Sequence, residues 1–408
     1  MWRLFECIIY AIIKNMNKRN GAVLSTVVIL KKTMAVFFEF FLNIYLFDIM
    51  NGNFGFLMAY SSYGAVVGLI AMYVALKFLN RKNAKFVFCF SLILRIVSIL
   101  MLLTLQDNIL SYIWIFKAID RTSDMWYYAV YETSLIRTSK HGRVGSFVAS
   151  MSILESITAV LAPAAFGLII DSFSYEVLFA IIAVDAILTA IIGMNIKIDF
   201  KSERLHLVKF MHRAFAKPNM REAYKTMFYQ RITMTGAMRY LLPIMMTMTL
   251  GTEFGVGSYT GLFAAIFILM MSGVRILNRY HVVKKFYIPS AFIILASAIV
   301  MIADANEATI LVYCFVSQTI GNVIATESKG AVYAIGKEEG LVRYTRESIF
   351  TWNIFLVCGQ LIGNLIAYLA FVGFDSQAGI IVAMTALMPF IVIQAYHLQN
   401  VQKWLKGR

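Results

Sequence analysis

Long apolar segments follow one another along almost the whole chain, and this repetition constrains the fold more than any other feature. A helix that crosses a bilayer needs about 20 mainly apolar residues. The sequence therefore predicts an all-α polytopic membrane protein with twelve transmembrane helices. The predicted spans are 27–48, 56–77, 85–104, 109–133, 145–170, 177–196, 228–250, 258–277, 286–303, 308–334, 347–373 and 377–398.

The composition excludes most other classes of protein. Hydrophobic residues make up 60% of the 408 residues and charged residues 14%, with a mean hydropathy of +0.73. Soluble chains average about 45–50% apolar and ~25% charged residues. Disordered and disulfide-stapled chains are excluded on the same grounds. The four cysteines lie far apart without a CxxC or Cys/His pattern, so we expect free thiols and no metal site.

The charges between the predicted spans follow an alternating pattern. One set of connections contains acidic residues but no Lys or Arg, and the other set is rich in Lys and Arg. By the positive-inside rule, both termini lie in the cytoplasm of a multi-pass protein of the plasma (cytoplasmic) membrane. The formal net charge of +15 then reflects topology and not nucleic-acid binding. The connections without Lys or Arg are 49–55, 105–108, 171–176, 251–257, 304–307 and 374–376.

A single long polar segment divides the chain. Residues 197–227 are predicted to form a basic cytoplasmic linker between one six-helix bundle at 21–196 and another at 228–400, and residues 401–408 a cytoplasmic tail. The apolar run within 1–20 is too short to cross a bilayer and no cleavage site follows it. We expect an amphipathic N-terminal cytoplasmic segment at the membrane interface.

The two halves match at a nearly fixed offset. KKTMAVFFEF from Lys31 matches RITMTGAMRY from Arg231, two hundred residues later, and Arg81 matches Arg279 at an offset of 198. An internal duplication explains these matches. Six predicted spans in each half give both halves the same orientation, so the repeat is parallel, about an axis along the membrane normal.

This arrangement resembles the major facilitator superfamily of transporters. The segment 73–82 (YVALKFLNRK) is similar to the family's GxxxDRxGRR loop, although Lys77 stands at the acidic position. GRVGS from Gly142 is similar to its RGRxxG-like turn, and APAAFG from Ala162 to its antiporter signature GPxxGG. The resemblance implies a central cavity lined by the first, fourth, seventh and tenth helices. It also implies gating loops that contain Arg81, Lys82, Arg143 and Arg279.

Several charged side chains lie inside predicted spans, where a charge costs at least ~2.5–3.5 kcal/mol to insert. The richest clusters fall on the four helices that the resemblance places around the cavity. In span four, four charges follow an i, i+3, i+4, i+7 spacing and so share one helical face. The predicted substrate- and proton-binding residues are Glu39, Lys117, Asp120, Arg121, Asp124, Tyr128, Arg239 and Glu327.

Structural roles remain as alternatives for these residues. The charges of span four could neutralise one another within the helix. Glu39 and Arg239, at the repeat offset, could pair as a gate or act separately, and Glu327 with Lys329 could form a structural tie.

Other polar and small residues within the spans have blander expected roles. We expect Arg95 to join Asp185 or Glu155 in a network. Lys31 and Arg231, near the inner ends of their spans, are expected to extend to the interface. The GxxxG motifs of spans two and eleven predict either a sliding contact between the halves or packing within a half.

The sequence predicts a secondary active, proton-coupled transporter of a small organic or amphipathic compound that works by alternating access. It predicts no catalytic residues. No phosphate loop and no HExxH motif is present, so we expect neither an enzyme nor ATP-driven transport by this chain alone. The APAAFG segment favours export. The alternatives are an importer of a small polar or zwitterionic solute, and a non-transporting scaffold or lipid scramblase. The expected partners are a small-molecule substrate, a proton or other coupling ion and the lipid bilayer. We expect no cofactor, and we expect the protein to be a monomer.

Overall fold

The computed structural model describes residues 18–80, 82–138, 144–196, 205–279, 285–341, 344–374 and 376–406. Helices are the regular elements of these residues, and no strand occurs among them. Seven of the described helices are long and apolar enough to cross a membrane. The all-α class is therefore confirmed, whereas the count of twelve spans stays a prediction. Most of the predicted amphipathic segment 1–20 lies outside the described residues.

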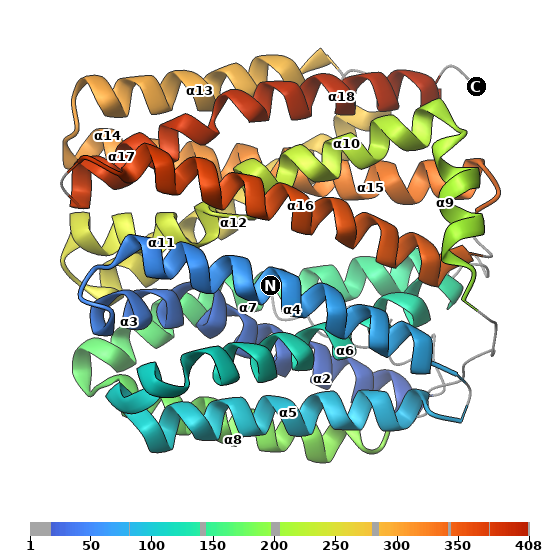
Figure 1. The fold of residues 1–408 in the computed structure, drawn as a ribbon, viewed down its shortest axis with the longest axis horizontal. Helices are drawn as coiled ribbons and strands as arrows, with labels where there is room; N and C mark the ends of the chain where they lie inside the picture. The colour runs from blue at the N-terminus through green and yellow to red at the C-terminus, as the bar shows by residue number, and fades with distance from the viewer. Residues whose placement is uncertain are drawn as a thin grey trace.

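The helices of the first half of the chain lie together in the lower part of Figure 1. Lipid offers no hydrogen-bond partner to a polar backbone group. In a helix these groups bond to one another within the segment, so apolar helices suit a bilayer. In chain order they are α2 (Lys18–Val36), η1 (Phe37–Phe41), α3 (Leu42–Ile49), α4 (Phe54–Phe78), α5 (Ala84–Leu105), η2 (Gln106–Tyr112), α6 (Ile113–Thr138), α7 (Val144–Ser172) and α8 (Tyr175–Gly193).

The helices of the second half occupy the upper part of the same view (Figure 1). The short α9 lies at the end of the molecule, beside α10 and α16. In chain order these helices are α9 (Leu207–Phe215), α10 (Pro218–Thr233), α11 (Met238–Leu250), α12 (Glu253–Arg279), α13 (Tyr287–Ala303), α14 (Glu307–Val316), η4 (Ser317–Gly321), α15 (Asn322–Glu338), α16 (Thr345–Phe371), α17 (Ser376–Leu387) and α18 (Pro389–Lys406).

The seventh predicted span differs from the observed helices in two ways. Helix α10 begins at Pro218, inside the segment predicted as a linker, because proline is well suited to a first helical turn. The helix then ends at Thr233, and α11 starts at Met238. A Cβ on Gly236 would lie 2.0 Å from the carbonyl oxygen of Arg231, so the turn between the two helices needs a glycine.

The two groups of helices meet along α4 and α16 and along α7 and α12. The α7–α12 contact brings backbones together, because a Cβ on Gly257 would lie 2.1 Å from the carbonyl oxygen of Pro163. Asp171 at the end of α7 accepts hydrogen bonds from the N–H groups of Glu253 (3.2 Å) and Phe254 (2.9 Å). It therefore caps the first turn of α12, where a negative charge also favours the helix dipole.

The GxxxG motifs do not make the contact between the halves. In α4 the motif faces α6, since a Cβ on Gly64 would lie 2.4 Å from the Cε of Lys117. In α16 the motif faces α10, since a Cβ on Gly359 would lie 2.3 Å from the carbonyl oxygen of Phe228. Both motifs serve packing within a half, the second of the two roles predicted for them.

We predict that Gly257→Ala destabilises the protein although alanine is the better helix former. The added methyl group has no room against the backbone of α7, and such overpacking costs about 1–3 kcal/mol. Gly273→Ala on the same helix is the matched control, because nothing lies within 4 Å of its Cβ position. The melting temperature of the detergent-solubilised protein checks this: equal values for the two variants would contradict the close contact.

Candidate functional site

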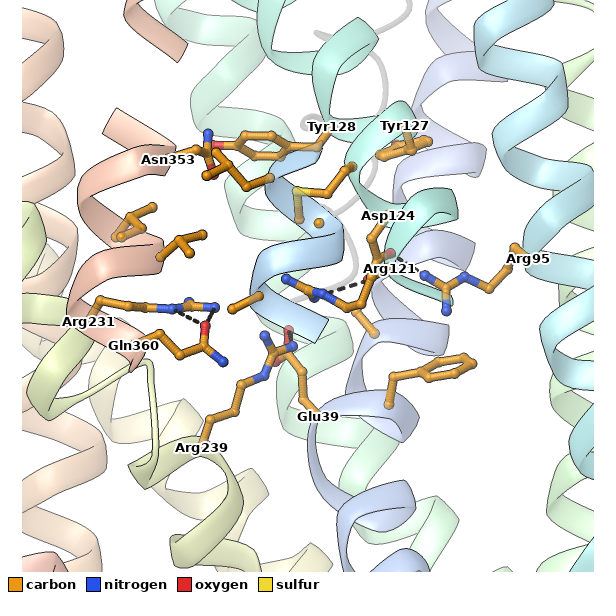
Figure 2. A pocket seen from close by; sticks show the side chains of 18 of the residues that line it. Glu39, Arg95, Arg121, Asp124, Tyr127, Tyr128, Arg231, Arg239, Asn353 and Gln360 are labelled. Carbon is orange, nitrogen blue, oxygen red and sulfur yellow. Dashed lines mark hydrogen bonds and ion pairs between the residues drawn. The ribbon is translucent and has the colours of Figure 1, made fainter. Parts of the chain in front are cut away.

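A cavity of about 350 Å³ lies between the two groups of helices (Figure 2). It is lined by side chains from α2, η1, α4, α5, α6, α10, α11 and α16, so both halves of the chain contribute to its wall. Of the predicted binding residues, the cavity is lined by Glu39, Arg121, Asp124, Tyr128 and Arg239.

An ion pair joins the two halves at this cavity. Arg239 Nη2 on α11 lies 2.7 Å from Glu39 Oε1 on η1, and each side chain is 31% exposed. Asn43 Nδ2, one turn further along, donates to the carbonyl oxygen of Glu39 at 2.7 Å and to that of Arg239 at 3.4 Å. Glu39 lies in a π-helical turn, an irregularity that often occurs at functional sites. Of the two arrangements that the sequence left open, the structure has the pair, and its role as a gate stays a prediction.

A cluster of cations surrounds Asp124 on α6. Arg95 on α5 forms ion pairs with both Asp120 and Asp124. Lys31 Nζ on α2 lies 3.1 Å from Asp124 Oδ1, and Arg121 Nη1 lies 3.7 Å from Asp124 Oδ2. Only the last of these pairs lies within one helix, so the charges of α6 are balanced mainly by other helices.

Of the two networks expected for Arg95, the one with Asp185 is wrong, and the one with Glu155 stays a prediction. Both carboxylate oxygens of Asp185 are buried and have no hydrogen-bond partner among the described residues. Arg95 instead turns toward α6, where two carboxylates on one helical face offer its guanidinium two acceptors.

Two of the predicted binding residues lie behind the cavity wall. Lys117 is buried, with its Nζ 3.4 Å from Tyr240 Oη and 4.0 Å from the centre of the Tyr60 ring. Asp120 is buried against Arg95. Neither residue is part of the lining, so the shared helical face of α6 divides between the cavity and the helix packing.

Glu327 also lies away from the lining. Its Oε2 accepts a hydrogen bond from Tyr287 Oη at 2.9 Å, which ties α15 to α13. Lys329 lies over the ring of the cavity residue Tyr128, 5.5 Å from its centre. The structural tie that the sequence left open for Glu327 is thus made to a tyrosine.

The structure describes two of the four predicted gating residues, Lys82 and Arg279. Arg81 and Arg143 lie outside the described residues, and Arg279 is the last residue of α12. Lys82 is exposed, and its N–H donates to Asn80 Oδ1 at 2.9 Å. The gating role of all four residues stays a prediction.

The sequence analysis missed Arg231 as a cavity residue. Its Nε and Nη2 donate to Gln360 Oε1 at 2.9 and 2.7 Å (Figure 2). Gln360 Nε2 in turn donates to Ser61 Oγ at 2.9 Å. The polar chain therefore runs from α10 through α16 to α4. Lys31 was missed as well. Lys31 and Arg231 were both expected to extend to the membrane interface. Their equivalence in the repeat was the one available signal.

We predict a measurable coupling energy between Glu39 and Arg239. In a double-mutant cycle with Glu39→Gln, Arg239→Gln and the double variant, the coupling should be about 1 kcal/mol, because the pair is in direct contact but partly exposed. Thermal unfolding in detergent measures it. Strict additivity of the two single substitutions would contradict the ion pair.

We predict that Arg95→Met lowers stability by about 3–5 kcal/mol, because it leaves two carboxylates without their shared buried cation. The exposed Lys82→Met is the control and should stay within about 0.5 kcal/mol of the parent. Both are compared by thermal unfolding. A small effect at Arg95 would mean that Lys31 and Arg121 suffice for the cluster.

Comparison with known proteins identifies the fold. No family model and no curated protein matches the sequence. The nucleoside transporter NupG superposes with a TM-score of 0.68 at 11% identity, over 95% of this chain and 99% of that chain. A bacterial homologue of the iron transporter ferroportin, in an inward-facing state, gives 0.65 at 12% identity over 96% and 100%. The E. coli fucose:proton symporter FucP gives 0.56 at 14% identity over 92% and 98%. The chain has the fold of transporters of the major facilitator superfamily type.

Proposed function

We propose that the chain is a secondary active transporter that carries a small molecule across a membrane by alternating access. In this proposal twelve helices form two six-helix bundles, 21–196 and 228–400, which rock about the cavity between them. The observation that carries the proposal is the charged cavity itself, to which both halves contribute. A charged hollow between apolar helices is costly unless it serves a solute or an ion.

The polar contacts that cross between the halves suit a reversible motion. They are ion pairs and hydrogen bonds, as between Glu39 and Arg239 or between Gln360 and Ser61, and they can break and form again in a second packing. Lys117 on α6 reaches across to Tyr240 on α11 in the same manner. In the proposed motion, the residues of each such contact have different partners in the two access states.

Asp124 is the proposed proton-binding residue. Its side chain is 31% exposed at the cavity, whereas that of Asp120 is 5% exposed. Its cationic partners lie on α2, α5 and α6 of the same half, and these ion pairs stabilise the ionised form of the carboxylate. A fucose:proton symporter among the proteins of similar fold makes the proton a reasonable coupling ion.

The APAAFG segment, from which export was expected, packs against α12, with the carbonyl oxygen of Pro163 beside Gly257. A role in closing the two halves suits import and export equally. We place the protein in the plasma membrane with cytoplasmic termini, as a monomer, and the transport experiment measures both directions.

We predict that proteoliposomes move at least one solute of a panel of uridine, fucose, phenylacetate and glucose 6-phosphate, and that an imposed pH gradient drives its accumulation. Asp124→Asn should reduce gradient-driven accumulation at least tenfold and retain exchange of solute across the membrane, because the neutral amide cannot carry the proton. Glu338→Gln, an exposed carboxyl change, is the control.

Three outcomes would each contradict a part of this proposal. Accumulation that ignores the pH gradient removes proton coupling, and full coupling in Asp124→Asn removes Asp124 as the proton-binding residue. Absence of flux for every solute, with lipid scrambling in the same vesicles, favours the scaffold or scramblase alternative.

A further inference from the structure

The two halves of the cavity wall treat equivalent cations differently. Lys31 on α2 and Arg231 on α10 stand two hundred residues apart, and both line the cavity. Lys31 is held by a carboxylate, with its Nζ 3.1 Å from Asp124 Oδ1. Arg231 is held by a neutral amide, the Oε1 of Gln360, and forms no ion pair with a described residue.

The sequence of the repeat explains this difference. Asp120 and Asp124 on α6 correspond, at the same offset, to Ile320 in η4 and Ile324 at the start of α15. The second half therefore lacks the carboxylates that balance the cations of the first half.

The cavity consequently carries an excess of positive charge. Five basic and two acidic side chains line it, and Asp120, which pairs with Arg95 from behind the wall, adds one more carboxylate. Two cations thus remain without a carboxylate of their own. An excess of charge in a site of low dielectric is stabilised by a ligand of opposite charge. The lining basic residues are Lys31, Arg95, Arg121, Arg231 and Arg239.

The geometry of Arg231 suits direct binding of an anion. A guanidinium has five N–H donors in a planar fork that matches carboxylate and phosphate groups. The two hydrogen bonds to Gln360 use two of these donors, from Nε and Nη2. In Figure 2 the Arg231 side chain extends from α10 toward the part of the cavity into which Arg121 extends from α6. A single anionic group between them would face guanidinium groups of both halves.

We propose that this cavity binds a small organic anion, whose carboxylate or phosphate group is held by Arg231 with Arg121 opposite. The inference rests on the proposed transport function and names its substrate class. The remainder of the bound anion lies against apolar and aromatic lining residues, among them Met125, Tyr128 and Leu356. A volume of about 350 Å³ is at the lower end of small-molecule sites, which suits a compact solute.

The test compares two anions with their uncharged counterparts. Phenylacetate and glucose 6-phosphate are added to the detergent-solubilised protein at constant ionic strength, beside phenylacetamide and glucose. We expect at least one anion to raise the melting temperature by several degrees and the uncharged compounds to leave it unchanged. The two anions also distinguish a carboxylate site from a phosphate site.

Substitutions at Arg231 locate the binding. Arg231→Gln should weaken anion binding at least tenfold, and Arg231→Lys, which keeps the charge but loses the planar fork, should weaken it less. Arg221→Gln, on an exposed part of the same helix, is the matched control and should bind as the parent does. The melting temperatures without ligand show whether each variant is folded, and Arg231→Lys serves if the glutamine variant is not.

The outcomes separate this inference from the transport proposal. Stabilisation by neither anion, equal stabilisation by the uncharged compounds, or undiminished binding in Arg231→Gln and Arg231→Lys would overturn the anion site. Anion binding without flux in proteoliposomes would contradict transport and leave the site in place. Flux of uridine or fucose alone, unaffected by Arg231→Gln, would support transport and overturn the anion site.

Discussion

The ion cluster around Arg95 is the interaction on which the arrangement of the site depends. One guanidinium neutralises two carboxylates of α6 at a depth where an unpaired charge is costly, and Lys31 approaches the same Asp124 from α2. The cluster thereby fixes α2, α5 and α6 relative to one another. It also separates two similar aspartates, because Asp120 is buried behind the wall and Asp124 remains at the cavity. The proposed chemistry of Asp124 is a consequence of that separation.

The sequence predicted the helical class and brought several charged residues correctly to one hollow, but it failed where helix ends were misjudged. Lys31 was placed near the start of a span, whereas α2 begins at Lys18; Arg231 was placed there too, whereas α10 begins at Pro218. Lys31 therefore lies well inside α2, whereas Arg231 lies in the last turn of α10, and both side chains line the cavity. The partners of Arg95 were unpredictable for another reason: a helical face limits which residues of α6 lie together, but says nothing of which helix supplies their counter-ions.

The duplication matters most where the halves depart from it. Equivalent positions carry opposite charges at Glu39 and Arg239, and the two pair across the interface. Equivalent cations at Lys31 and Arg231 have unlike partners, because the second half has isoleucine in place of Asp124. The wall of the cavity is therefore asymmetric at positions that the predicted repeat makes equivalent.

Gln360 connects the proposed binding site to the interface between the halves. Its side-chain oxygen accepts from Arg231 within the second half, and its Nε2 donates to Ser61 on α4 of the first half. An anion that draws Arg231 away from Gln360 would leave that amide with its contact to α4 alone, and so alter an interface contact without touching α4. A ligand shifts a conformational equilibrium only by as much as it binds the two states differently. In the proposed transport cycle, α4 and α16 are packed together in one state and separated in the other. The Arg231–Gln360–Ser61 chain is a physical route by which a bound anion would bind these two states with different affinity.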